Sequence, residues 1–160
     1  MSTLSSDPKI NIDLVRKLAI RAYPNNQVLA DLTTAQAILE SNLTGQPSQL
    51  AFKYNNLFGI KGSGTKGSVT LPTHEFVGGR EITVNQAFAW NESVEDSIQQ
   101  RKSLFENGTK DKHNRYFRVL AAPTFEDAAH ELLKAGYATD PAYATALINI
   151  YNKYIKPLGN

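Results

Sequence analysis

Two glutamates stand in settings that suit acid–base chemistry. Glu40 follows the apolar residues Ala37, Ile38 and Leu39, and Glu75 lies in a strand-like segment further along the chain. Desolvation beside apolar side chains favours the protonated form of a carboxyl group, whereas a solvated strand favours the carboxylate. Hydrolysis of a glycosidic bond needs this pair, because one acid protonates the leaving group while a second group stabilises or attacks the sugar. We therefore expect Glu40 to be the proton donor and Glu75 to be the second acid.

Aromatic side chains are the second group that could act on a sugar, because a flat ring stacks on the apolar face of a pyranose. Core packing is the alternative for each of them, above all for Phe58 and Trp90. Tyr137 follows Gly136 where a helix is expected to end, a place from which a side chain can emerge into a cleft. The candidates for substrate binding are Tyr54, Phe58, Trp90, Tyr137 and Tyr143, and the alternative acids to Glu75 are Glu81, Glu92 and Glu95.

Helices must position Glu40. Apolar residues recur at helical spacing over residues 14–22, ending before Pro24, and again over residues 28–43. Pro47 is expected to be the first residue of a short third helix that runs towards Tyr54, because proline lacks the donor that a helix start leaves unpaired. Glu40 then lies beside the buried stripe of the second helix.

A small β region should carry Glu75. The strand-like runs Ser68–Leu71 and Glu81–Val84 flank Gly78 and Gly79, which predict a turn. Helices resume after it, and their starts are marked by side chains that can cap them. These starts are Ser93 with Asp96, Thr124 with Asp127, and Asp140 with Pro141.

Composition limits the remaining possibilities. The 160 residues suit one domain, with residues 1–10 as a flexible N-terminal segment, and the net charge is only +2 with Lys and Arg scattered among acids. No run of eighteen apolar residues occurs, and the three histidines have no ligand spacing. We therefore expect a monomer without a metal or cofactor, which neither binds nucleic acid nor inserts into a membrane.

Four blocks of the chain resemble glycoside hydrolase family 73, the bacterial and phage endo-β-N-acetylglucosaminidases that cut peptidoglycan. They are Ala35–Ser41, Asn55–Gly62, Thr73–Phe76 and Ala135–Ala144, in the order and spacing of the family. The resemblance implies an α+β, mainly helical, lysozyme-like fold with a helical lobe, a small β-hairpin lobe and a groove between them for the glycan strand.

The resemblance also implies roles for particular residues. Glu40 matches the general acid of the family, and Glu75 matches its second acid on a mobile β segment. Tyr137 matches the tyrosine that positions the N-acetyl group of the substrate or the intermediate, and Asn56 matches a polar groove residue. The chain departs from the family at Ser41–Gly45, where the usual Ser-Gly-Trp-Gly is absent and one aromatic wall of the groove is lost.

The expected activity is hydrolysis of the β-1,4 bond between N-acetylglucosamine and N-acetylmuramic acid, with peptidoglycan glycan strands as the partner and cell-wall lysis as the result. The alternatives are a muramidase or a lytic transglycosylase on the neighbouring bond, and a non-catalytic wall-binding phage tail module. The first residues do not form a signal peptide. The expected localisation is therefore the host cytoplasm with phage-type release, or the virion.

Overall fold

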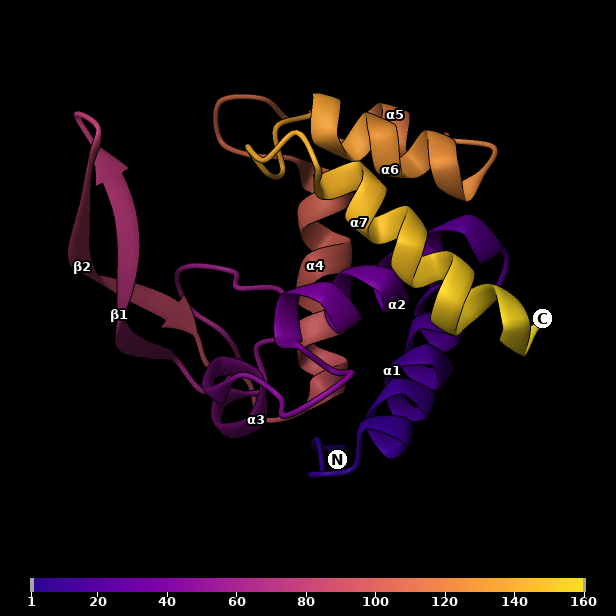
Figure 1. Cartoon of the computed structure of the whole chain (residues 1–160), viewed down its shortest axis with the longest axis horizontal. Helices are drawn as coiled ribbons and strands as arrows, with labels where there is room; N and C mark the ends of the chain where they lie inside the picture. The colour runs from indigo at the N-terminus through magenta and orange to yellow at the C-terminus, as the bar shows by residue number, and fades with distance from the viewer. Residues whose placement is uncertain (1, 160) are drawn as a thin grey trace.

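Helix α2 (Gln27–Ser41) is the centre of the helical body in this computed structural model, which describes residues 2–159 (Figure 1). Its residues from Leu29 to Ile38 are all buried, as expected for a helix without charged side chains between Asp31 and Glu40. Helices α1 (Pro8–Ala22), α6 (Phe125–Lys134) and α7 (Tyr143–Ile150) pack around it. The core of the molecule therefore lies directly behind the end of α2 that carries Glu40.

The remaining helices complete the body around α2. They are α3 (Gln49–Tyr54), α4 (Val94–Asn107), α5 (Phe117–Leu120), a π-helical turn η1 (Tyr151–Ile155) and a 3₁₀ turn η2 (Lys156–Leu158). The Ser93 side chain accepts the Asp96 N–H, and the Thr124 side chain accepts the Asp127 N–H, so two of the three predicted starts are confirmed. The third is wrong, because α7 begins at Tyr143 after the N-cap Ala142, and Asp140 accepts the Ala142 N–H in a turn before it. None of these helices, within residues 2–159, is both long and apolar enough to cross a membrane.

The predicted hairpin is confirmed, and its strands are longer than the strand-like runs that predicted them. Strands β1 (Ser68–Val77) and β2 (Arg80–Ala89) pair antiparallel over their whole length, with Ser68 opposite Ala89. Gly78 and Gly79 form the turn with φ angles of 59° and 77°, which few residues other than glycine adopt readily. The hairpin projects from the body beside the helices (Figure 1), so the expected α+β class with two unequal lobes is confirmed.

The N-terminal segment differs from the flexible segment expected over residues 1–10. Pro8 already begins α1, because the Asp7 side chain caps the helix by accepting the Lys9 N–H. Before it, Leu4 is buried in the core and the Ser5 N–H donates to Asn11 Oδ1 at 2.7 Å. Apolar burial and capping thus fix this segment against the body, while residue 1 lies outside the described range.

Pro47 is not the first residue of the third helix, as the sequence predicted. Ser48 is its N-cap, with a side chain that accepts the Ala51 N–H, and α3 begins at Gln49. A serine cap satisfies one of the donors that a helix start leaves free, so it sets the boundary. Pro47 only precedes it.

Candidate active site

Glu40 lies at the C-terminal end of α2, where the chain turns through the left-handed residue Asn42. Its Oε1 accepts a hydrogen bond of 2.8 Å from the Tyr143 hydroxyl on α7. The side chain is exposed because it opens onto a cleft, yet the walls around it exclude much of the water. Burial raises the pKa of Glu40 above its ordinary value, and the hydrogen bond from Tyr143 opposes that rise only in part. The carboxyl group is therefore suited to hold a proton.

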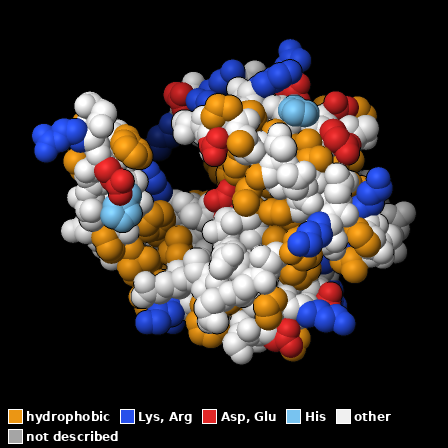
Figure 2. All heavy atoms as spheres, viewed as in Figure 1, with side chains coloured by type: hydrophobic (Ala, Val, Ile, Leu, Met, Phe, Trp, Pro, Cys, Tyr) orange, Lys and Arg blue, Asp and Glu red, His pale blue; other side chains and the backbone are white. Residues whose placement is uncertain are grey.

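The cleft in front of Glu40 has a volume of about 450 Å³, within the range of sites that bind small ligands. Figure 2 shows the deep hollow that separates the hairpin from the helical body on this face of the molecule. The lining is mixed, with backbone and aromatic surface beside one acid and one lysine, which suits a sugar. Its residues are Glu40, Phe58, Gly59, Ile60, Lys61, Leu104, Tyr116, Gly136, Tyr137 and Ala138.

One wall of the cleft is the loop that follows α3. Asn56 is buried inside this loop, where its Nδ2 donates to the carbonyls of Ile60 and Ala89 at 2.9 Å each. Its Oδ1 accepts the Ile60 N–H at 3.2 Å. Asn56 was expected to be a polar residue of the groove, but its polar atoms face the backbone, because an unpaired amide in this interior would cost free energy. It shapes the wall and ties it to the base of β2.

Tyr137 and Phe58 are the two predicted aromatics that line the cleft. Gly136, with a φ of 83°, turns the chain after α6 and so presents Tyr137 towards Glu40. The Tyr137 ring stacks on Tyr143 with 6.0 Å between ring centroids. Burial raises the pKa of Tyr137, so its hydroxyl keeps its proton and can donate a hydrogen bond.

Glu75 lies near the tip of the hairpin, opposite Ile82. It is half-buried on the less exposed face of the hairpin, whereas His74 and Glu81 approach each other to 3.1 Å on the other face. Glu75 is not among the side chains that line the cleft of Glu40. The structure thus keeps the two carboxyl groups on separate lobes and brings only one of them to the cleft.

Tyr54 and Trp90 form a cluster of their own at the base of the hairpin. Their rings meet edge to face with centroids 5.3 Å apart, and Lys66 Nζ lies 4.7 Å above the Trp90 ring. Neither ring lines the cleft of Glu40. Tyr54 ends α3 and Trp90 directly follows β2, so the two rings pack together where the hairpin joins the body. Their binding role stays a prediction.

Two buried polar residues behind Glu40 were missed by the sequence analysis. Gln36 Nε2 donates to the Tyr143 hydroxyl at 2.9 Å, and Arg101 Nε donates to Gln36 Oε1 at 2.9 Å. Both residues are fully buried. A signal was present, because Gln36 lies between the apolar residues Ala35 and Ala37 of α2, and Arg101 falls on the apolar stripe of α4 with Ile98 and Phe105.

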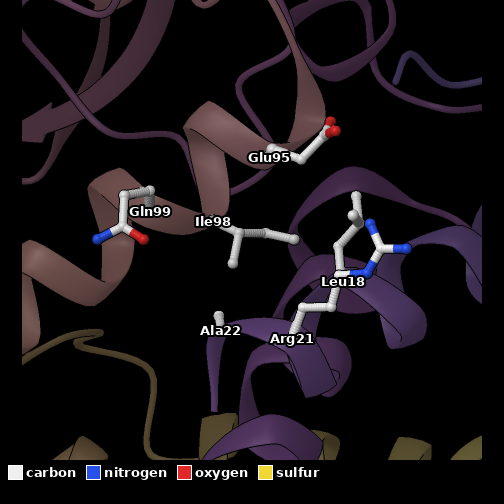
Figure 3. A pocket seen from close by; sticks show the side chains of 6 residues that line it. All are labelled: Leu18, Arg21, Ala22, Glu95, Ile98 and Gln99. Atoms are coloured by element: carbon white, nitrogen blue, oxygen red, sulfur yellow. The ribbon is translucent and has the colours of Figure 1, made fainter. Parts of the chain in front are cut away.

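A second hollow, of about 200 Å³, lies between α1 and α4 (Figure 3). Its one acid, Glu95, accepts hydrogen bonds of 3.2 Å from both the N–H and the hydroxyl of Ser2, so its oxygens are already engaged. Leu18, Ala22 and Ile98 supply most of the remaining surface. Within residues 2–159, no three acids or histidines gather to hold a metal ion. The cleft of Glu40 is therefore the candidate active site.

The fold and this cleft, with one acid at the end of a buried helix, suit a glycosidase. The profile of the glucosaminidase family, described as mannosyl-glycoprotein endo-beta-N-acetylglucosaminidase, matches residues 16–156. The chain belongs to this family, glycoside hydrolase family 73, as the resemblance predicted.

Two relatives illustrate the range of the family. The chain is 37% identical to the exo-glucosaminidase LytG of Bacillus subtilis over 148 residues, which are 92% of this chain and 52% of that protein. It is 35% identical to a probable N-acetylmuramidase of Lactococcus lactis subsp. cremoris, covering 88% of this chain and 33% of that protein. The chain thus spans about half of the first relative and a third of the second.

A solved structure shares the fold. The catalytic domain of the autolysin Auto from Listeria monocytogenes superposes with a TM-score of 0.82 at 28% identity, over 96% of this chain and 88% of that one. The expected lysozyme-like architecture, with helices and one small antiparallel sheet, is confirmed.

Proposed function

We propose that this chain hydrolyses the β-1,4 bond between N-acetylglucosamine and N-acetylmuramic acid in peptidoglycan, with Glu40 as the general acid. The observation that carries the proposal is the setting of Glu40. Its carboxyl group opens onto a cleft of sugar-binding character while burial raises its pKa. Membership of the glucosaminidase family supports the substrate class.

Glu40 gives its proton to the bridging oxygen as the bond from that oxygen to the anomeric carbon breaks. The positive charge that develops on the sugar then needs a partner on the opposite face, and water finally supplies the new hydroxyl group. Glu75 is the proposed second acid of the protein, acting as base, nucleophile or stabiliser. The N-acetyl group of the substrate is the other candidate nucleophile.

Glu75 would reach the bound sugar from the hairpin lobe, across the hollow seen in Figure 2. In this proposal the Tyr137 hydroxyl donates a hydrogen bond to the N-acetyl group, which fits its place in the cleft beside Glu40. Phe58 is only 4% exposed, so it supports the cleft wall from the core. Tyr143 acts from behind, through its hydrogen bond to Glu40.

The bond that is cut can be read from the products. Digestion of purified peptidoglycan followed by mass spectrometry should yield fragments with N-acetylglucosamine at the reducing end. Reducing-end N-acetylmuramic acid would instead identify a muramidase, the activity in the name of the Lactococcus relative, and an anhydro sugar would identify a lytic transglycosylase. The sizes of the early products separate cleavage within the strand from cleavage at its end.

A non-catalytic wall-binding module is the alternative from another class. It would bind peptidoglycan without releasing any fragment, and a Glu40→Gln variant would bind equally well. Release of fragments by the native chain and none by the variant would support the enzyme. The proposed place of action is the bacterial cell wall, and phage-type release or association with a virion stays a prediction from the sequence.

A further inference from the structure

A chain of buried hydrogen bonds runs from the core of the molecule to the acid. Arg101 on α4 donates through Nε and Nη2 to Gln36 Oε1, and Gln36 Nε2 donates to the Tyr143 hydroxyl at 2.9 Å. The Tyr143 hydroxyl lies 2.8 Å from Glu40 Oε1. Three elements of the helical body, α4, α2 and α7, thus converge on one oxygen of Glu40.

The chemistry of the groups gives this chain a single direction. A guanidinium group can only donate, so the atom of Gln36 that faces Arg101 must be its carbonyl oxygen. The amide nitrogen of Gln36 then faces Tyr143 and can only donate. The one hydroxyl proton of Tyr143 is left to point at Glu40 Oε1. That oxygen therefore accepts a hydrogen bond whether Glu40 is ionised or neutral.

We propose that Arg101, Gln36 and Tyr143 position the proton of the acid, by reserving Glu40 Oε1 as an acceptor and confining the proton to Oε2. This inference rests on the proposed role of Glu40 as general acid. A carboxylic acid with two equivalent oxygens would carry its proton on the wrong one for part of the time. The hydrogen-bond chain removes that alternative, so the neutral acid is ready to donate from Oε2.

Arg101 is suited to anchor such a chain because it is held on every side. Its side chain is fully buried, and no carboxylate in residues 2–159 forms an ion pair with it. Nη1 donates to the Thr33 hydroxyl at 2.7 Å, and the guanidinium group lies 4.1 Å from the centroid of the Phe105 ring. A carboxylate in place of Gln36 would satisfy Arg101 more fully. Only the amide of Gln36 can accept from Arg101 with one atom and donate a hydrogen bond to Tyr143 with the other.

Other groups that face Glu40 carry charge or titrate, and they set the background for any pH measurement. Tyr143 comes from α7, Tyr137 follows α6, Tyr116 precedes α5, and Lys61 lies on the loop wall. Burial raises the pKa of all three tyrosines, so they stay neutral as the pH rises through the pKa of Glu40. A shift of that pKa in a Gln36 variant can then be assigned to the hydrogen-bond chain.

The test is Gln36→Glu, a change of nearly the same shape. The new carboxylate accepts a hydrogen bond from Arg101 with one oxygen and presents its other oxygen to Tyr143. The Tyr143 hydroxyl then donates to this oxygen and no longer to Glu40. Glu40 then loses a donor and gains a nearby negative charge, and both changes raise its pKa. Because only the protonated acid is active, the alkaline limb of the kcat profile should move to higher pH. The kcat at its optimum should fall about ten- to hundredfold, since the proton now sits on Oε1.

Tyr143→Phe is the second variant, and it keeps the test valid if Gln36→Glu folds poorly. Without the hydroxyl group the acid again loses its donor, so the alkaline limb should again move upward while kcat falls. The double variant should lose no more kcat than Tyr143→Phe alone, because the hydrogen-bond chain is already interrupted. The matched control is Thr34→Val, which removes a buried hydroxyl on the same helix that bonds only to Ala30. Its profile should match the native one.

The outcomes separate this inference from the proposed function. If folded Gln36→Glu keeps the wild-type kcat and the wild-type alkaline limb of the pH profile, the positioning role is overturned. An inactive Glu40→Gln would in that case still support Glu40 as the acid. Full activity of Glu40→Gln would overturn the proposed function itself. A lower kcat with an unmoved alkaline limb would mean that Gln36 acts only through packing, and this too would overturn the inference.

Discussion

The two lobes of the molecule hold their candidate acids in opposite ways. Glu40 ends a helix that is buried on every side and is hydrogen-bonded from a neighbouring helix. Glu75 stands near the tip of a two-stranded hairpin that is exposed over most of its length, with Phe76 beside it 76% exposed. Two strands alone have marginal stability in water. The molecule therefore holds the proposed proton donor in its packed body and carries the proposed second acid on a much less supported element.

Removal of the acid should produce the largest effect. Glu40→Gln keeps the shape and the acceptor for Tyr143 but cannot give up a proton. We expect kcat to fall about a thousandfold. The melting temperature should not fall, because a neutral amide costs less to bury than an ionised carboxyl group. Fragment release and thermal unfolding measure the two effects, and a large loss of stability would show that Glu40 also supports the fold.

The next effect concerns the body that holds the acid. Leu32 is fully buried on α2 within the core. Leu32→Ala should lower the free energy of unfolding by about 2–5 kcal/mol through lost burial and a residual cavity. Chemical denaturation measures this value. A change below about 1 kcal/mol would mean that the body is less tightly packed than the comparison of the lobes requires.

Removal of the second acid should have a smaller effect on activity than removal of the first. We expect Glu75→Gln to lower kcat about ten- to hundredfold if the N-acetyl group of the substrate shares its role. The alkaline limb should stay where Glu40 sets it, at a pH above 4.5, the ordinary pKa of the side chain. The pH profile checks this assignment. Unchanged turnover would remove Glu75 from the site, and a loss as great as that of Glu40→Gln would make it an essential base or nucleophile.

The smallest effect is expected at the tip of the hairpin. Phe76 is largely exposed, so Phe76→Ala removes little buried surface. The free energy of unfolding should change by less than about 0.5 kcal/mol. Thermal unfolding measured beside Leu32→Ala completes the comparison of the two lobes. A clear loss of stability would mean that the tip packs against the body in solution.

Local signals explain how much of the fold the sequence predicted. Gly78 and Gly79 predicted the hairpin turn, and Ser93 and Thr124 predicted the starts of α4 and α6. These predictions succeeded because each of these residues shapes or caps the backbone within a few positions of itself. The setting of Glu40 was also predictable, since apolar neighbours along one helix imply burial. The residues alone indicated Glu75 and Tyr137 as candidates, the family resemblance matched them to particular roles, and these roles stay predictions.

Long-range contacts explain what the sequence did not predict. Arg101 reaches Gln36 across 65 positions of the chain, and Asn56 reaches Ala89 across 33. No periodicity reveals such pairs, because it reports which face of a helix is buried and not what lies opposite. The edge-to-face packing of Tyr54 on Trp90, which are 36 positions apart, is another contact that the sequence did not predict.

The three hydrogen bonds of Asn56 mark the boundary between the hairpin and the helical body. Its side chain binds the carbonyls of Ile60 and Ala89, and backbone hydrogen bonds from the Ala89 N–H to Ile60 and from the Gly62 N–H to Ala87 join the same two segments. Exchange of residues 69–86 for the hairpin of a relative would leave these hydrogen bonds in place. A chimaera made in this way would take its residue at position 75 from the donor and keep Glu40, so it would test the two proposed roles separately.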